Sequence, residues 1–223
     1  MMTYRRGSRG EMVHQIQKAL AGAGLKVIPD GIFGAITEEA VKAFQRMKGM
    51  KAIDGIVGPA TLAMLFPCRF KKSKRSITEI IVHCSATPEG KDFTVDDIRR
   101  WHKQRGFADV GYHYIIYRNG HIVNGRDVDL VGAHCTNRNS HSIGICYIGG
   151  MDAQNKKPKD TRTLAQKAAL LSLLVDMRKL YPNAAIIGHR DTSPDLNGNG
   201  TVEPSEFIKA CPSFDAKAEY RKV

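Results

Sequence analysis

The pattern of apolar positions divides the chain into two regions with different secondary structure. In residues 7–65, apolar side chains recur at every third or fourth position, as at Val13, Ile16 and Leu20. This spacing is that of one face of an α-helix, and it predicts three short helices. After residue 76, short runs rich in β-branched residues alternate with helical patterns. Strands with intervening helices are typical of a mixed α/β layer structure.

The second region has a definite set of expected elements. Strands are expected at 77–83, 112–117, 121–123, 143–148 and 184–187, with the Asn119-Gly120 hairpin turn between the second and third. Helices are expected over 94–106, with Thr94 as N-cap, and over 163–180. The longer helix has an apolar stripe expected to face the core: Leu164, Ala168, Leu171, Val175 and Leu180. We therefore predict a mixed central β-sheet flanked by helices, preceded by a small all-α three-helix domain.

An imperfect repeat marks the first region. DGIFGAIT at 30–37 is followed by DGIVGPAT at 54–61. Asp-Gly with a second Gly is typical of a tight turn, because glycine adopts positive φ without steric cost. Thr37 and Thr61 then stand where a helix N-cap is expected. Residues 66–76 (FPCRFKKSKRS) have no periodicity, so we predict domains at 1–66 and 77–223 joined by a solvated linker at 67–76.

The composition narrows the class of partner. The net charge of +12 over 223 residues suits a polyanion, such as nucleic acid, anionic lipid or a cell-wall polymer. A specific nucleic-acid binder would combine a clustered basic face with a recognition motif, and neither is found. The apolar runs are too short for membrane insertion, and no secretory signal is visible at the start. Five cysteines at irregular spacing favour reduced thiols or metal ligands over a disulfide framework.

Three residues form a candidate metal site. His83 ends the first expected strand, His189 follows the last one, and Cys211 lies further along the chain. Strand ends can meet at one edge of a sheet, and two imidazoles with a thiolate suit zinc, leaving a fourth position for water. Zinc in such an open site lowers the pKa of its bound water to roughly 7. Spacing alone does not select this trio, since eight histidines and five cysteines allow many others, and each histidine has a structural or surface role as its alternative.

A second candidate metal site is the segment 195–206. It fits the calcium-loop pattern D-x-[DN]-x-[DN]-G-x5-E, with candidate ligands Asp195, Asn197, Asn199, Thr201 (through its carbonyl) and Glu206. Two asparagines lower the ligand charge, and no entering helix precedes the loop, although a helix over 203–210 is expected. The alternative is a polar turn held by its own side chains. Bound Ca²⁺ would have a structural task, fixing the approach of Lys209 and Cys211.

Longer blocks of sequence carry a family resemblance. Seven segments in order resemble the zinc-dependent N-acetylmuramoyl-L-alanine amidases of the phage-lysozyme branch, which are akin to the peptidoglycan recognition proteins. They are HCSAT (83–87), WHKQRGFADVGYHY (101–114), NGRD (124–127), VGAH (131–134), HSIGICYIGG (141–150), GHRD (188–191) and KACPSF (209–214). The repeat at 7–65 resembles the peptidoglycan-binding domain found beside many wall hydrolases. The two resemblances cover nearly the whole chain and agree on one substrate.

The resemblance implies roles for individual residues. The trio of His83, His189 and Cys211 matches the zinc ligands. Tyr112 matches a tyrosine that assists the metal-bound water, and Lys209 matches a lysine that stabilises the transition state. His134 matches a residue near the substrate groove.

The implied function is that of an endolysin-type peptidoglycan hydrolase. It would cleave the amide between N-acetylmuramic acid and L-alanine of the stem peptide with a zinc-activated water, while the N-terminal domain binds the wall. We expect a monomer, made in a bacterial host cytoplasm and acting on the wall after release, as a phage or prophage lysis enzyme does. The alternative is a non-catalytic peptidoglycan-binding receptor on the same fold, which predicts a broken ligand set. A nucleic-acid binder is a third, weaker hypothesis that rests on charge alone.

Overall fold

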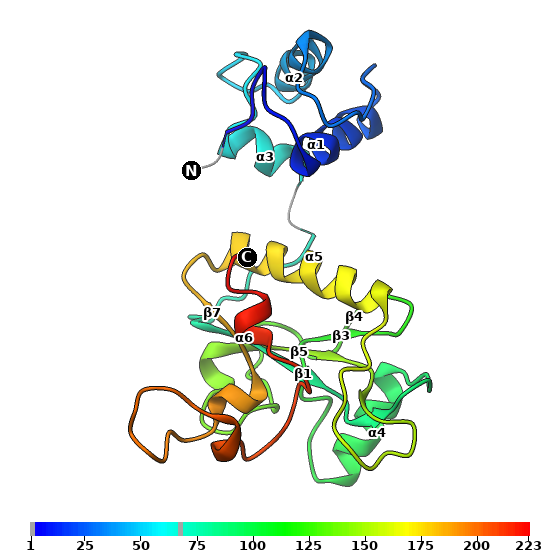
Figure 1. Cartoon of the computed structure of the whole chain (residues 1–223), viewed down its shortest axis with the longest axis vertical. Coiled ribbons are helices and arrows are strands. Elements are labelled where there is room, and N and C mark those ends of the chain that lie inside the picture. Colours follow the sequence, from blue (N-terminus) through cyan, green and yellow to red (C-terminus); the bar gives the residue numbers. More distant parts are fainter. Residues whose placement is uncertain (1–2, 67–68) are drawn as a thin grey trace. The chain divides into compact units, whose positions relative to one another are not determined.

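The chain folds as two compact units. The computed structural model describes residues 3–66 and 69–223, so residues 67 and 68 of the predicted linker lie outside it. The division falls between the units Met1–Arg69 and Phe70–Val223 (Figure 1). Each unit has its own hydrophobic core. Within the described residues, no helix is both long enough and apolar enough to cross a membrane.

The first unit contains the three predicted helices. These are α1 (Glu11–Gly22), α2 (Ala35–Met47) and α3 (Pro59–Leu65). The apolar stripe Val13, Ile16 and Leu20 of α1 is fully buried and packs with Val41 and Phe44 of α2. The helical periodicity of the sequence therefore located this core correctly.

The two repeat threonines do not cap helices, so that prediction is wrong. Helices α2 and α3 begin before them, and Thr37 and Thr61 lie buried inside the first turns. A buried glutamine explains their position. Gln17 Nε2 donates to Thr37 Oγ1 at 2.9 Å, and Gln45 Nε2 donates to Thr61 Oγ1 at 3.2 Å. The threonine hydroxyls thus serve the interior of the unit.

Each of these glutamines also holds the Asp-Gly-Ile turn of its repeat. Gln17 Oε1 accepts the N–H of Gly31 at 2.8 Å, while its Nε2 contacts Asp30 Oδ1 at 2.8 Å and the carbonyl of Ile32 at 3.0 Å. The same bonds recur around Gln45 with Asp54, Gly55 and Ile56. The sequence repeat is therefore a repeated hydrogen-bond network, here named the glutamine clamp. Both clamp glutamines are 1% exposed.

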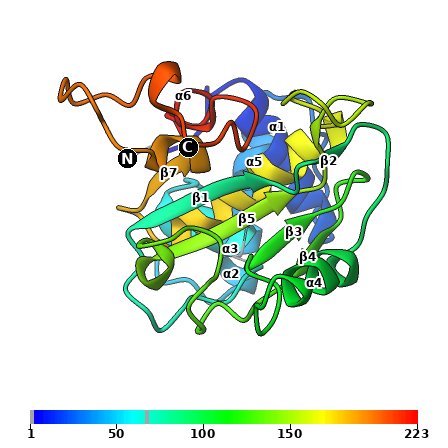
Figure 2. The same cartoon turned by 90° about the horizontal axis from the view of Figure 1, so that it is seen from below.

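A five-stranded mixed sheet organises the second unit (Figure 2). Its order is β4-β3-β5-β1-β7, with only the β3–β4 hairpin antiparallel. The strands are β1 (Glu79–Cys84), β3 (Tyr114–Ile116), β4 (Ile122–Asn124), β5 (Ser142–Tyr147) and β7 (Ala185–Gly188). A separate two-stranded sheet pairs β2 (Thr87–Pro88) with β6 (Gly150–Met151). The predicted mixed sheet is confirmed.

Helices cover both faces of this sheet. Helices α5 (Leu164–Leu180) and α6 (Ala216–Glu219) pack with one face, and α4 (Val95–Gln104) packs with the other (Figure 1). Thr94 caps α4 as predicted, in a capping box with Asp97. Short 3-10 turns complete the unit: η1 (Asn139–His141), η2 (His189–Thr192) and η3 (Pro204–Glu206).

The buried face of α5 differs from the predicted one. Four residues of the expected stripe face solvent: Ala168 is exposed, as are Leu164, Leu171 and Val175, with exposures of 87%, 45% and 41%. The helix instead buries a neighbouring stripe: Leu170, Leu173, Leu174 and Met177. Because α5 is apolar on more than one side, periodicity alone does not select the face that meets the sheet.

The basic run before β1 is not a solvated linker throughout, which corrects that interpretation. The backbone N–H of Ser73 donates to the Tyr181 hydroxyl at 2.7 Å, and Ser73 Oγ donates to the carbonyl of Val128 at 2.7 Å. The Arg75 side chain donates to the same carbonyl at 2.9 Å. This part of the run is therefore fixed to the second unit.

Candidate metal centre

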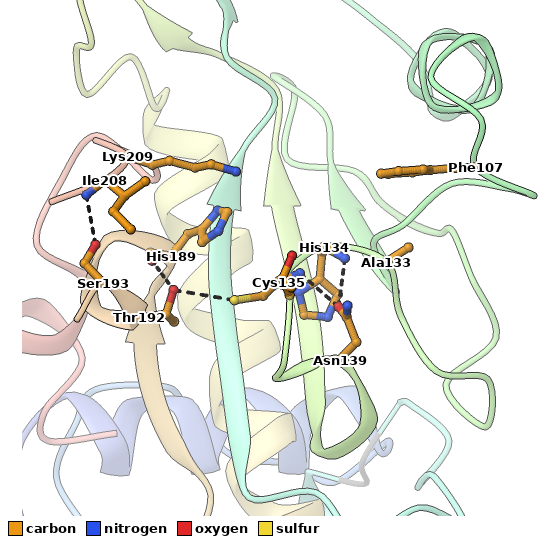
Figure 3. A pocket seen from close by; sticks show the side chains of 11 residues that line it. Phe107, Ala133, His134, Cys135, Asn139, His189, Thr192, Ser193, Ile208 and Lys209 are labelled. Atoms are coloured by element: carbon orange, nitrogen blue, oxygen red, sulfur yellow. Dashed lines mark hydrogen bonds between the residues drawn. The ribbon is translucent and has the colours of Figure 1, made fainter.

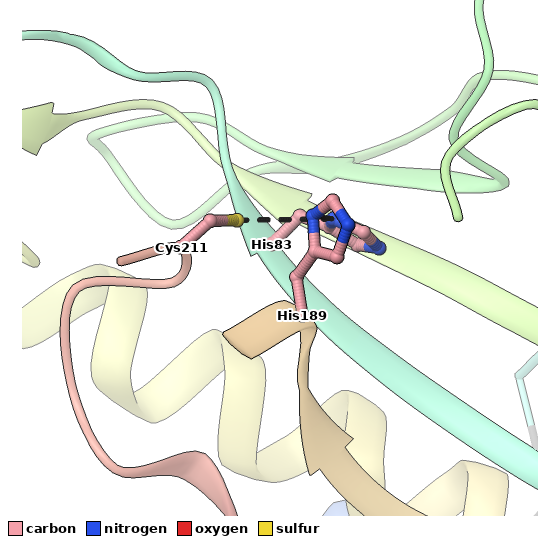
Figure 4. A group of neighbouring side chains, drawn as sticks. All are labelled: His83, His189 and Cys211. Atoms are coloured by element: carbon pink, nitrogen blue, oxygen red, sulfur yellow. Dashed lines mark hydrogen bonds between the residues drawn. The ribbon is translucent and has the colours of Figure 1, made fainter. Parts of the chain in front are cut away.

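Neighbouring parallel strands bring the two candidate histidines together. Strands β1 and β7 pair in register with Val82 opposite Gly188, so His83 and His189 follow side by side at the carboxyl ends. Their Nδ1 atoms are 3.1 Å apart, and Cys211 Sγ lies 3.8 Å from His83 Nδ1 (Figure 4). The three candidate ligand atoms all lie within 4.8 Å of one another.

The alternation of β1 separates the histidine from its neighbouring cysteine. Cys84 packs in the core on the α5 side of the sheet. His83 faces the other side and is 1% exposed. The backbone N–H of Cys84 donates to Cys211 Sγ at 3.3 Å, and the carbonyl of Cys211 accepts the N–H of Arg190 at 2.7 Å. These contacts fix the thiol beside the imidazoles.

The electrostatics of the trio suit a cation. Burial, together with the nearby His134 and His189, holds the pKa of His83 well below its ordinary value. Burial and the Lys209 ammonium lower the pKa of His189 to about 4. Both imidazoles are therefore neutral at pH 7. The hydrogen bond with the Cys84 thiol and burial raise the pKa of Cys211, so its thiol needs a bound cation to ionise.

The donor set fits zinc. Two imidazole nitrogens and one sulfur are the ligands of a borderline-soft metal, and zinc binds them in tetrahedral geometry. In the part of the chain that the structure describes, no other group of three or more His, Cys, Asp or Glu side chains converges in this way. Three protein ligands would leave a fourth position for water, as in catalytic zinc sites.

A cleft of about 480 Å³ opens beside the trio. Figure 3 shows Lys209 extending over His189 from one side, with Phe107 across the cleft. Lys209 is exposed, and its charge acts on both candidate histidine ligands. Phe107 and Ile208, which also line the cleft, were not singled out from the sequence, although each lies in or beside a block that carries the resemblance.

Tyr112 lies against the metal centre. Its ring centroid is 5.1 Å from that of His83, with the planes tilted by 51°. It precedes β3, although the sequence predicts it inside a strand. Burial raises the pKa of Tyr112 well above its ordinary value, so the phenol stays protonated. It can donate a hydrogen bond, but it is not a base at neutral pH.

His134 lines the cleft, but most of the residue is buried. Its side chain belongs to a residue only 9% exposed, and its Nδ1 is 3.1 Å from His83 Nε2. The sequence led us to expect a residue of the substrate groove. The contact with a candidate ligand was missed, because no spacing rule relates VGAH to the end of a strand 51 residues earlier.

The candidate calcium loop is held by its own hydrogen bonds. Asp195 accepts the N–H groups of Gly198 and Gly200, at 2.8 and 2.7 Å. Glu206 Oε2 accepts the N–H of Glu203 at 2.8 Å, and its Oε1 accepts those of Asn197 at 3.1 Å and Leu196 at 2.7 Å. These hydrogen bonds, that of Glu203 foremost, lower the pKa of Glu206. The helix expected over 203–210 is wrong, since only the 3-10 turn η3 forms.

Comparison with known proteins agrees with this geometry. Residues 73–206 match the family N-acetylmuramoyl-L-alanine amidase, and residues 9–65 match a peptidoglycan binding domain. The endolysin of Klebsiella phage KP32 is 43% identical over 149 residues, covering 67% of this chain and 89% of that protein. The endolysin of Escherichia phage T7 is 40% identical, covering 68% and 90%.

A solved structure supports the fold. The endolysin amidase LysCS from Clostridium intestinale URNW superposes with a TM-score of 0.50 at 24% identity, covering 68% of this chain and 89% of that one. The chain therefore belongs to the N-acetylmuramoyl-L-alanine amidase family and carries a peptidoglycan-binding domain ahead of its amidase domain.

Proposed function

We propose that the chain is a zinc-dependent, endolysin-type peptidoglycan hydrolase. It cleaves the amide between the lactyl group of N-acetylmuramic acid and L-alanine of the stem peptide. The observation that carries this proposal is the convergence of His83, His189 and Cys211 beside an open cleft. A non-catalytic receptor would be expected to have lost part of this set, so the intact trio favours the enzyme.

The side chains around the trio have distinct tasks in amide hydrolysis. Zinc held by the trio would supply Lewis acidity and would lower the pKa of water. Lys209 reaches over the cleft, where its positive charge stabilises the oxyanion that develops on the scissile carbonyl. Tyr112 stays protonated, so we assign it as a hydrogen-bond donor that orients water or substrate, and not as the general base.

The products identify the reaction. Purified protein is incubated with peptidoglycan, with and without a chelator, and the fragments are identified by mass spectrometry. Free stem peptides that begin with L-alanine, lost on chelation and restored by zinc, are the expected result. New reducing sugar ends would instead identify a glycosidase and overturn the proposal.

The wall-binding role of the first unit is a separate part of the proposal. It is supported by the match of residues 9–65 to a peptidoglycan binding domain. We propose that this unit retains a monomeric enzyme on bacterial peptidoglycan after release from the host cytoplasm, in keeping with the phage endolysin relatives. Sedimentation with purified sacculi should pull down the full chain more completely than residues 70–223, and equal sedimentation would contradict the role.

Calcium in the loop 195–206 stays a prediction. Its carboxylates Asp195 and Glu206 already accept backbone hydrogen bonds, which an ion would have to replace in part. If Ca²⁺ binds, calorimetric titration shows heat and the melting temperature rises. Neither change is expected if the loop is a self-bonded turn.

A further inference from the structure

We propose that His134 is a positioning residue that fixes His83 in the tautomer needed for metal binding. It acts as the middle link of a hydrogen-bond chain that runs from His83 through His134 and Ser142 to the carbonyl of Arg138. The inference rests on the proposed zinc site. It replaces the substrate-contact role expected for His134 with a role inside the protein.

The carbonyl of Arg138, at the end of this hydrogen-bond chain, determines which atom donates and which accepts at each link. The carbonyl of Arg138 can only accept, so Ser142 Oγ, 2.7 Å away, donates its proton there. The Ser142 oxygen is then left to accept from His134 Nε2–H, at 3.5 Å, which is the longest link. A neutral His134 protonated on Nε2 has its lone pair on Nδ1. That nitrogen lies 3.1 Å from His83 Nε2 and accepts its proton.

The consequence appears at the other side of the His83 ring. With its proton on Nε2, the imidazole presents the lone pair of Nδ1 to the point where the other two candidate ligands converge. Metal-binding histidines commonly donate their second ring N–H to a partner that fixes tautomer and orientation. Here that partner is a neutral imidazole, and its acceptor atom is set by a backbone carbonyl two links away.

The surroundings of the His134 ring leave it little freedom. Glycines lie against it at two places: a Cβ added to Gly132 or to Gly144 would come within 2.5 Å of the ring carbon Cδ2. Its backbone is fixed as well, since Asn139 Oδ1 accepts the N–H groups of His134 and Cys135 at 2.9 Å each (Figure 3). Any side chain larger than glycine at either position would displace the ring.

Both nitrogens of His134 are thus used inside the protein. One faces His83 and the other faces Ser142 Oγ, and the residue is 9% exposed. A substrate-binding histidine would need at least one ring nitrogen directed into the cleft. The geometry therefore favours positioning over substrate contact.

Zinc affinity of the full-length chain tests the proposal. Affinities are measured by competition with a chromophoric chelator for the parent and for His134→Leu, His134→Asn and His134→Gln. Leu removes the acceptor, Asn can place its amide oxygen near the Nδ1 position, and Gln places its amide further out. We expect Leu and Gln to weaken binding by ~10–100-fold, the usual range for such partners, and Asn to recover most of the loss.

Two further variants sharpen the result. Ser142→Ala removes the anchor of the chain and should weaken zinc binding by less than His134→Leu, because its link to His134 is the longest. His121→Ala removes an exposed imidazole that is not part of the hydrogen-bond chain, and it should leave the zinc affinity unchanged. Nitrogen-15 NMR of the imidazoles in the metal-free parent should show His83 protonated on Nε2, with a tautomer mixture in His134→Leu.

The outcomes separate this inference from the proposed function. A parent that binds no zinc would refute the zinc site itself. A folded His134→Leu that binds zinc as tightly as the parent, with His83 still protonated on Nε2, would overturn the positioning role and leave the zinc site intact. If the Leu variant does not fold, equal affinities for the Asn and Gln variants overturn the role.

Discussion

The two units bury polar side chains in opposite ways. In the first unit, Gln17 and Gln45 are almost fully buried, and both polar atoms of each amide are paired within the same repeat. In the second unit, the nitrogens of His83 and His189 and the sulfur of Cys211 converge on one point beside an open cleft. Burial alone therefore does not mark a functional site.

The difference lies in where the unshared electron pairs are directed. A clamp glutamine matches donors to acceptors, so nothing is left to recruit a ligand. The trio assembles three atoms that can all act as acceptors toward a cation, and burial keeps the imidazoles neutral for that purpose. Saturated networks stabilise the fold, and converging acceptors create a binding site.

The largest expected effect is that of breaking the trio. Cys211→Ser replaces the soft ligand with a poor one, and the loss of several kcal/mol of metal-derived stabilisation should lower kcat/KM by ~10³ or more. Zinc content and amidase activity are measured together. Cys135→Ser is the matched control, since that buried thiol contacts Thr192 and is not in the trio. Full zinc occupancy in Cys211→Ser would contradict the assignment.

Removing the cation over the cleft should have the next largest effect. Lys209→Ala deletes an oxyanion-stabilising charge, and kcat should fall by ~10²–10³. Zinc content and melting temperature should stay at parental values, because Lys209 is exposed and contributes no ligand. Lys217→Ala removes an exposed lysine of α6 and serves as the control. An unchanged kcat would remove Lys209 from the mechanism.

The glutamine clamp should matter for stability and not for chemistry. Gln45→Leu leaves the buried N–H of Gly55 without its partner, at a cost of ~1–3 kcal/mol, while the carbonyl of Ile56 keeps the hydroxyl of Thr61. Hydrogen exchange in α2 and α3 reports the loss. The fluorescence of Trp101, the single tryptophan, reports the second unit and should keep its urea midpoint. Gln15→Leu, at an exposed position of α1, should change stability by less than ~0.5 kcal/mol.

Acid should destabilise the second unit, with a smaller effect for each residue involved than in the predictions above. Burial lowers the pKa of His102, His113 and His189 to about 4, so between pH 6.5 and 4 the unfolded chain binds more protons than the folded one. Stability of the metal-free second unit should therefore fall as the pH falls, by up to ~1.4 kcal/mol per pH unit for each histidine. The urea midpoint of Trp101 fluorescence measures it. A midpoint constant from pH 7 to 5 would contradict these shifts.

Local patterns predicted most of the fold. Helical spacing located the buried stripe Val13, Ile16 and Leu20, and the Asn119-Gly120 pair located the hairpin. The face of α5 was not predictable, because leucines occur around the helix and only the sheet decides which are covered. Thr37 was wrongly predicted as a helix N-cap for a related reason. Its partner Gln17 lies 20 residues away, and capping rules consider only neighbouring residues.

The site was predictable only in part. That His83 and His189 meet follows from strand ends in a shared sheet, although selecting these two histidines required the family resemblance. The role of His134 was not predictable, since it depends on ring orientation and on an acceptor chosen by a distant carbonyl. The contacts of Ser73 and Arg75 with the second unit were not predicted, because a basic segment without periodicity is also typical of a free linker.

The segment between His189 and Cys211 contains a loop whose two ends are joined by a hydrogen bond. The backbone N–H of Ile208 donates to Ser193 Oγ at 3.0 Å, so the excursion 194–207 leaves and rejoins the domain at one point (Figure 3). Closing a longer excursion adds only about 0.6 kcal/mol for each doubling of its length. Insertions there should be tolerated, which makes this turn a grafting position where new wall-targeting peptides can be added without moving the catalytic groups.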